Sequence, residues 1–315
     1  RRAGGVPAQE SPRRAGGVPA QSSPPMGGSV VATGDSGQSA GIRTLTDADL
    51  RAVRELLNQR PLENLFLSSR LDLFGLDPLR LGCPVWGFER DGRLVAICHA
   101  GVNLVPVGGD PEALQAFADR AGPRRISQSI MGEAVQVMAL FDLLRSKWPE
   151  TWGSSREVRA HQPLMMIDSE PLVEPDERVR PASMTEFSSY FAAAVAMYTE
   201  EVGVSPLDPA GTYRQYVRLL IESGRAFAGV TGGHVWFKSD IGSASGKYCQ
   251  VQGVWLEPSL RGRKLSEPAM AQVVRLCRRE FEVVSLYVND FNTPARRLYE
   301  RVGFRTVGEL ATVLY

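Results

Sequence analysis

The sequence predicts an α/β (α+β) protein in which a central mixed sheet is flanked by helices, and it indicates two such domains. Residues 248–258, the helix that follows and residues 283–288 read in order as a strand, a helix with one apolar face and a buried strand, which is a βαβ unit. The chain has 315 residues, a usual length for two domains, and 43% of them are hydrophobic, enough for two ordinary cores.

The first 41 residues differ in composition from the rest of the chain. Residues 1–12 and 13–24 are a near-perfect duplication, and the stretch to residue 41 is mostly Gly, Pro, Ser, Ala and Gln. Such a segment has too little apolar surface to offset the entropy of ordering, so we expect a disordered tail over 1–41. Because the printed chain opens without Met, Met26 is a candidate translation start.

Residues 42–170 are expected to form an N-terminal domain. Helices are predicted within 47–60 and over 62–74, an Asp-Gly hairpin over 85–100, and a strand over 102–107. The remaining elements are a helix at 111–120, a strand at 125–130, a helix at 133–148 and a strand at 162–167. We interpret His99 and His161 as ordinary structural histidines.

The second domain, residues 171–315, begins with a Pro-rich acidic linker that runs into a short strand near residues 178–180. Helical periodicity follows over 184–201 and 212–223, then a hairpin over 225–242 around Thr-Gly-Gly. The end of the chain, 304–315, reads as one or two closing strands. The βαβ unit lies between the hairpin and this end.

A basic turn, SLRGRKLSEP at 259–268, joins the first strand of the βαβ unit to its helix. The unpaired N–H groups of a first helical turn and the helix dipole favour an anion there. Arg261, Arg263 and Lys264 add positive charge, and Ser266 is the expected N-cap. The turn therefore predicts a polyphosphate site.

A second helix follows the unit in the stretch VNDFNTPARRLYERVGF. Asn292 or Thr293 is its expected cap, Pro294 fits its first turn, and Gly303 ends it as a C′ glycine. Tyr299 lies on the apolar face of this helix, so we expect it to point inward, toward the mouth of a cleft.

This order of elements, with RGRKLS in the turn and VNDFNTPARRLYERVGF after it, resembles the acetyl-CoA-binding core of the GNAT (GCN5-related) N-acetyltransferases. The resemblance covers residues 175–315, and the full chain is similar to a bacterial subgroup with an extra N-terminal domain of unknown function. Two positions depart from the family pattern: Lys264 stands where the first motif glycine is usual, and Ser266 where Gly or Ala is. Lys264 either blocks the approach of the phosphates or reaches over them.

The resemblance extends to residues 42–170, whose predicted order of elements is also GNAT-like. Its turn, VGGDP at 107–111, is too short and too acidic to hold a pyrophosphate, and the helix after it lacks an inward Tyr. We therefore interpret this domain as a degenerate second copy, kept for packing or for shaping the acceptor site.

The resemblance implies transfer of an acetyl group from acetyl-CoA, as co-substrate and without a metal, to an amine of a small molecule or protein. The main chain of Val254 and Leu256, with Trp255 between them, would hold the pantetheine and the acetyl carbonyl. The remaining coenzyme-binding residues implied are Arg261, Gly262, Arg263, Lys264, Leu265 and Ser266 around the pyrophosphate, with Asn289 and Asn292. Arg275, Arg278 and Arg279 are either a solvated helix face or a 3′-phosphate site.

Acyl transfer to an amine also needs an acid and a base. By the resemblance Tyr299 protonates the leaving thiolate, for which a phenol with a pKa of about 10 is suitable; the alternative is a plain core aromatic. Glu257, at the strand end, and Glu200 and Glu201, on the loop that lines the acceptor pocket in the family, are the candidate bases. Each of these carboxylates has the alternative of being merely solvated.

Composition limits the partners. The 36 basic and 35 acidic residues give a net charge of +1, so no overall field recruits nucleic acid or an acidic membrane. No apolar run approaches the roughly 18 residues of a transmembrane helix. The four cysteines lie far apart in apolar runs, which is typical of a reducing cytoplasm. Three functions remain open: an N-acetyltransferase, a coenzyme-binding regulatory module without turnover, and an interaction scaffold.

Overall fold

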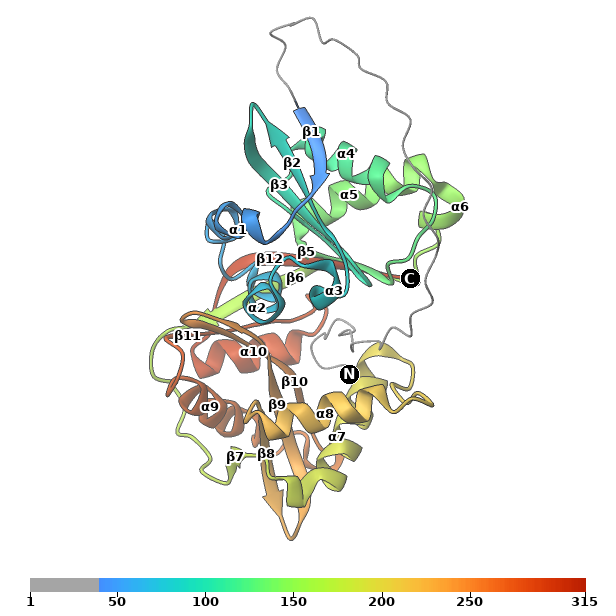
Figure 1. The fold of residues 1–315 in the computed structure, drawn as a ribbon. Helices are drawn as coiled ribbons and strands as arrows, with labels where there is room; N and C mark the ends of the chain where they lie inside the picture. The colour runs from blue at the N-terminus through green and yellow to red at the C-terminus, as the bar shows by residue number, and fades with distance from the viewer. Residues whose placement is uncertain (1–39) are drawn as a thin grey trace, which may run out of the picture.

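The computed structural model describes residues 40–315, which form a mixed sheet of 12 strands flanked by helices (Figure 1). The predicted mixed sheet with flanking helices is therefore confirmed. The duplicated segment lies outside the described residues, and so does the predicted tail apart from residues 40 and 41, which begin the first strand.

The N-terminal half, described over residues 40–170, contains six strands and six α-helices, two of them of four residues each. In chain order they are β1 (Ala40–Thr44), α1 (Leu50–Leu57), α2 (Leu65–Phe74), α3 (Pro78–Leu81), β2 (Val85–Arg90), β3 (Arg93–Ala100), β4 (Asn103–Val107), α4 (Pro111–Ala121), β5 (Ser129–Glu133), α5 (Ala134–Lys147), α6 (Pro149–Trp152) and β6 (Glu157–Ile167).

The C-terminal half repeats this order with fewer short helices. Its elements are β7 (Val179–Pro181), α7 (Phe187–Val202), α8 (Thr212–Glu222), β8 (Ala226–Thr231), β9 (His234–Ser245), β10 (Tyr248–Leu256), α9 (Ser266–Cys277), β11 (Val283–Tyr287), α10 (Thr293–Val302) and β12 (Arg305–Leu314). The predicted βαβ unit corresponds to β10, α9 and β11, and β12 is a single closing strand.

One prediction for the N-terminal half needs correction, and one strand of that half had no prediction. The strand expected at 125–130 lies later, in β5, because the Arg125 guanidinium donates to the carbonyl oxygens of Thr151 in α6 and of Ser127, which holds that segment against the helix. Strand β1 was not predicted; it lies at the edge of the sheet and pairs only with β2, so little apolar patterning marks it in the sequence.

Each half has a parallel central pair of strands joined by a crossover helix. Strands β4 and β5 are joined by α4, and β10 and β11 by α9. The sheet order β1-β2-β3-β4-β5-β12-β6-β11-β10-β9-β8-β7 shows that the two halves mirror one another about the centre of the sheet. The N-terminal half is thus a second copy of the same arrangement, as its element order predicts.

The last strand of each half is exchanged. Strand β6, from the N-terminal half, pairs with β11, and β12, from the end of the chain, pairs with β5 and with β6 (Figure 1). Ala311 and Val313 of β12 accordingly belong to the apolar core around α4 and α5. The sheet therefore runs without a break across the predicted division at residue 170, which stays a prediction.

Candidate functional site

The central strands of the C-terminal half separate soon after they meet. Strands β10 and β11 pair only over Tyr248–Gln250 and Val283–Ser285, although β10 continues to Leu256. Beyond this point β10 remains paired with β9, with a bulge between Gln252 and Trp255 where Gly253 takes φ +59°. The predicted pantetheine-binding residues lie on this free stretch: Val254 is half-buried against the α9 core, and Trp255 and Leu256 are buried.

A buried polar network lies directly behind the bulge. Lys238 Nζ donates to Asp240 Oδ2 at 2.5 Å, and the Tyr190 hydroxyl donates to the other oxygen of that carboxylate. A Cβ built on Gly253 would meet Lys238 Nζ at 2.8 Å and Asp240 Oδ2 at 2.9 Å. Glycine at this position therefore lets the ion pair contact the backbone of the bulge.

The basic turn leads into an open helix N-terminus. Helix α9 begins at Ser266, and Leu265 is its N-cap, so the prediction of Ser266 as N-cap is wrong. The reason is that Lys264 takes φ +58° and Leu265 is already in the αR region, which turns the chain into the helix one residue earlier. In the described chain no side chain accepts a hydrogen bond from the first N–H groups of α9.

The corresponding helix of the N-terminal half is closed. Asp110 is the N-cap of α4, and its carboxylate accepts a hydrogen bond from the Ala113 N–H at 3.0 Å. Arg90 donates to the same carboxylate at 2.8 Å. The Ala113 N–H bond and Arg90, in that order, lower the pKa of Asp110, so a fixed negative charge already holds the place an anion would take.

The residues of the basic turn divide into paired and exposed groups. Arg261 donates to both oxygens of Glu200, at 2.6 and 2.7 Å, and to the carbonyl of Leu256 at 3.1 Å. This pair couples a predicted phosphate ligand to a predicted base. Gly262, at φ +82°, Arg263 and Lys264 are exposed beside the start of α9, so they remain accessible to a phosphate.

The two asparagines differ in what they contact. Asn289 is 2% exposed, and its Oδ1 accepts a hydrogen bond at 2.9 Å from Gln162 of the exchanged strand β6. Asn292, one of the two predicted caps, is the N-cap of α10 and accepts from the Ala295 N–H at 3.3 Å. Its Nδ2 is buried without a hydrogen-bond partner in the described part of the chain. Asn292 thus has a spare donor at the start of α10.

The predicted catalytic residues differ in their burial and in the charges that act on them. Tyr299 is 4% exposed, and its pKa is raised by burial and then by the charge of Glu201. The Glu201 side chain is 1% exposed at the end of α7. Glu257 instead lies 3.0 Å from Nε2 of the exposed His234 on β9. Of the three candidate bases, Glu201 is the one whose charge the Tyr299 phenol senses.

Arg159 contacts Glu201 as well, although nothing in the sequence indicated this contact. It comes from β6, in the N-terminal half, and its side chain is 4% exposed. It donates to both carboxylate oxygens of Glu157 at 3.0 Å and to the Glu201 carbonyl at 3.2 Å. Its Nη1 lies 3.8 Å from Glu201 Oε1. Only the strand exchange, which local pattern does not show, brings these residues together.

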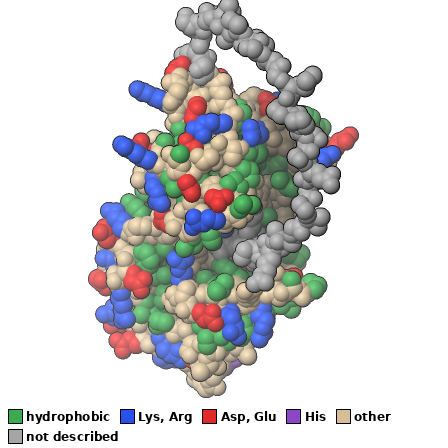
Figure 2. Space-filling model, in the orientation of Figure 1, with side chains coloured by type: hydrophobic (Ala, Val, Ile, Leu, Met, Phe, Trp, Pro, Cys, Tyr) green, Lys and Arg blue, Asp and Glu red, His purple; other side chains and the backbone are tan. Residues whose placement is uncertain are grey.

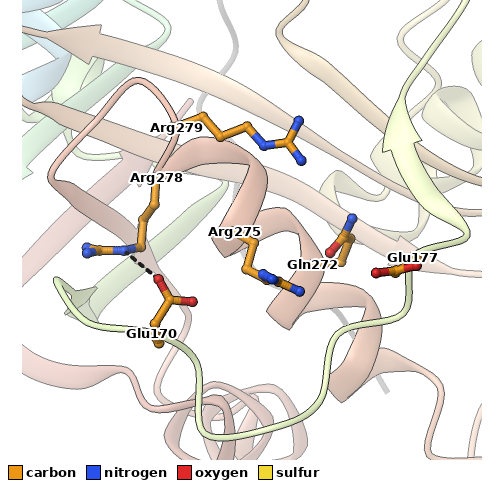
Figure 3. Close-up of a pocket in the computed structure, with 6 residues that line it drawn as sticks. All are labelled: Glu170, Glu177, Gln272, Arg275, Arg278 and Arg279. Atoms are coloured by element: carbon orange, nitrogen blue, oxygen red, sulfur yellow. Dashed lines mark ion pairs between the residues drawn. The ribbon is translucent and has the colours of Figure 1, made fainter.

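Arg275 lies in the last turn of α9, and Arg278 and Arg279 follow directly after the helix. All three are therefore away from the basic turn, which lies at the other end of α9. They line a cavity of about 450 Å³ with Gln272 of the same helix and with Glu170 and Glu177 of the segment before β7 (Figure 3). Arg278 pairs at 4.0 Å with Glu170. The arginines therefore do not join the site formed by the basic turn and the separated strands.

On the face drawn in Figure 2, Lys and Arg side chains alternate with Asp and Glu instead of forming one basic patch. Within residues 40–315, no helix is long and apolar enough to span a bilayer. The same residues contain no group of three or more His, Cys, Asp or Glu side chains that could bind a metal ion.

The comparisons with known proteins agree with this geometry. Residues 184–304 match the model of the acetyltransferase (GNAT) family, and residues 83–190 match a domain of unknown function (DUF4081). The mycothiol acetyltransferase of Brachybacterium faecium is 38% identical over 77 residues, which are 24% of this chain and 23% of that protein. The match thus spans about a quarter of the curated relative's length.

Solved structures show the same fold at low identity. An acetyltransferase of the GNAT family from Colwellia psychrerythraea has a TM-score of 0.55 at 13% identity, covering 87% of this chain and 99% of that one. A GCN5-related N-acetyltransferase from Sphaerobacter thermophilus has a TM-score of 0.54 at 17% identity, covering 87% and 94%. Both likenesses extend over the two halves of the chain.

Proposed function

The chain belongs to the GNAT acetyltransferase family and carries an extra N-terminal domain, and on that premise we propose that it is an acetyl-CoA-dependent N-acetyltransferase acting on an amine of a small molecule or a protein. One observation carries the proposal. The N-terminus of α9 is uncapped beside two exposed cations and the separated ends of β10 and β11, whereas Asp110 closes the equivalent helix of the N-terminal half.

The residues present fit a coenzyme A thioester. The first N–H groups of α9, with Arg263 and Lys264, would bind the pyrophosphate. The backbone of β10 from Val254 to Leu256, which β11 does not pair, would bind the pantetheine amides and the acetyl carbonyl. The spare Nδ2 of Asn292 would donate to the coenzyme. The thioester supplies the activated acetyl group.

The acid and base roles follow from the burial of two residues. The acceptor nitrogen forms a bond to the acetyl carbon while the carbon–sulfur bond breaks, the amine proton passes to Glu201, and the Tyr299 hydroxyl gives its proton to the thiolate. The Tyr299 phenol is protonated at neutral pH, and burial, followed by the charge of Glu201, raises its pKa further.

A second candidate function is a coenzyme-binding regulatory module without turnover. It is favoured by one observation, the bidentate pair between Arg261 and Glu200, which engages a predicted phosphate ligand and a predicted base with each other. Turnover separates this candidate from the first, because both bind the coenzyme. We further propose a cytoplasmic location, because the four cysteines are free and buried, as in proteins of reducing compartments.

The test is calorimetric titration of the full chain with acetyl-CoA, followed by thiol release with a panel of amines. The panel starts with mycothiol-related amines, because the curated relative is named a mycothiol acetyltransferase. We expect binding, and we expect Tyr299→Phe to bind equally well while turning over about 10²-fold more slowly or worse, the usual contribution of a general acid. Absence of binding would overturn the acetyltransferase proposal. Binding without release for any amine would favour the regulatory module.

A further inference from the structure

Strand exchange places one strand of the N-terminal half inside the C-terminal site. Strand β6 pairs with β11 from Ile167 to Leu164, and its backbone then accepts from the Val288 and Asp290 N–H groups through Pro163 and His161. The N-terminal half therefore reaches the end of β11 where the predicted coenzyme asparagines begin. Arg159 lies two residues further along this strand.

Arg159 connects the exchanged strand to the proposed base. Its Nη2 donates to the Glu201 carbonyl, its Nη1 lies 3.8 Å from the Glu201 carboxylate, and its remaining bonds go to Glu157. Both the Arg159 and the Glu201 side chains are less than 5% exposed. At such burial the two charges interact strongly, and the planar guanidinium fixes direction as well as charge.

The charged and titratable groups around Glu201 come from five elements. They are Arg159 and Glu157 of β6, Tyr198 of α7, Tyr213 of α8, Tyr287 of β11 and Tyr299 of α10. In each of the four tyrosines burial is the largest cause of a raised pKa, and the charge of Glu201 adds to it. Arg159 lies 3.8 Å from the Glu201 carboxylate and so favours its ionised form, while Arg156 is a second cation that acts on Tyr198.

We propose that Arg159 is a positioning residue through which the N-terminal half completes the acetyl-transfer site. Its guanidinium orients Glu201 and keeps it ionised, ready to take the proton of the acceptor amine. This inference rests on the proposed function, in which Glu201 is the base, and it gives the domain of unknown function a chemical role. Glu157 opposes the effect, because it shares the guanidinium and adds a negative charge nearby.

The test compares pH profiles of amine acetylation for the full chain and three variants. In Arg159→Met we expect kcat/KM for the amine to fall about 10²-fold and the acidic limb to move to higher pH, because the stabilising cation is lost. Arg159→Lys, which keeps the positive charge, should recover part of the lost kcat/KM and part of the shift of the acidic limb. Glu157→Gln should move the acidic limb to lower pH. Coenzyme affinity should stay within about twofold in all three, since none lies at the basic turn.

The matched control is Arg145→Met, which removes an exposed arginine of the same half that pairs with Asp142. Opposite shifts for the Arg159 and Glu157 variants support the inference, because a merely structural role does not reverse sign. Wild-type turnover with an unchanged profile in Arg159→Met overturns the inference alone. Equal losses of activity and coenzyme affinity in Arg159→Met and Arg159→Lys overturn it as well. Failure of the wild type to bind acetyl-CoA overturns the proposed function with it.

Discussion

Replacing Lys264 by glycine should stabilise the protein although it removes a charge. Lys264 has φ +58°, a left-handed conformation that side chains with a Cβ adopt at a cost of roughly 1–2 kcal/mol. The side chain is exposed, and no hydrogen bond or ion pair of its ammonium is seen within residues 40–315, so little packing is lost. The substitution therefore acts mainly on the backbone.

The expected gain is the relieved strain minus the extra freedom of glycine in the unfolded chain. That freedom costs about 0.4–1 kcal/mol, which leaves a net stabilisation of about 0.5–1 kcal/mol. For a protein of this size, a change of that order raises Tm by roughly 1–4 °C. Scanning calorimetry of the full chain without coenzyme measures it directly.

Lys264→Ala is the matched control, because it removes the same ammonium and keeps the Cβ. It should be no more stable than the wild type, so the difference between the Gly and Ala variants isolates the backbone strain. The same two variants, titrated with acetyl-CoA, separate the alternatives for the turn. Equal weakening in both means that the ammonium contacts phosphate; tighter binding by Lys264→Gly alone means that the Cβ obstructs it. A Gly variant no more stable than Ala would refute the strain argument.

Three further predictions concern folding. A fragment of residues 171–315 lacks β6 and so exposes edges of β11 and β12; we expect aggregates or exchanged dimers on size-exclusion chromatography, and a stable monomer would contradict this. Lys238→Met should lower the free energy of unfolding by about 3–5 kcal/mol by leaving the Asp240 charge buried without its cation, and adding Asp240→Leu should restore most of it in urea titrations. The Arg43 hydrogen bond lowers the pKa of Asp49 from 3.8 to about 2, so Asp49 should contribute stability that is lost as pH falls from 3.8 to about 2. Burial raises the pKa of Tyr315 from 10 to about 12, so Tyr315 should contribute stability that is lost as pH rises from 10 to about 12. Unfolding midpoints across pH that fail to change in Asp49→Asn and Tyr315→Phe would contradict the last prediction.

Features with local causes could be predicted from the sequence. Asn292 caps α10 and Gly303 ends it at φ +115°, as a cap residue before Pro and a glycine after the last turn indicate. Lys264 stands at a position where the motif has glycine, and it takes a positive φ of the kind that favours glycine. The predicted N-cap of α9, Ser266, is wrong by one residue, because the conformation of Lys264 starts the helix one residue earlier.

Features that depend on pairing at long range could not be predicted. The closing strand carries the alternation of any half-buried strand, and nothing in it distinguishes pairing with β11 from pairing with β5 and β6. Arg159 is 42 residues from Glu201 in the chain, and an arginine in a strand is ordinarily read as solvent-facing. The position of Asn289 against Gln162 has the same cause, since it exists only after the strands exchange.

The strand exchange also explains how the N-terminal half, whose described residues contain no open anion site, can contribute residues to the site of the C-terminal half. In the N-terminal half the Asp110 carboxylate occupies the helix terminus that α9 leaves open, so this copy has no place for a pyrophosphate. Its last strand, however, does not pair with its own β5 but with β11, so residues on β6 lie in the neighbouring site. Changes in the N-terminal half are then constrained mainly through β6 and the core that supports it. We expect substitutions at Arg159 to be felt in acetyl transfer and substitutions at Asp110 to be felt only in stability, a difference that the same pH profiles and melting curves measure.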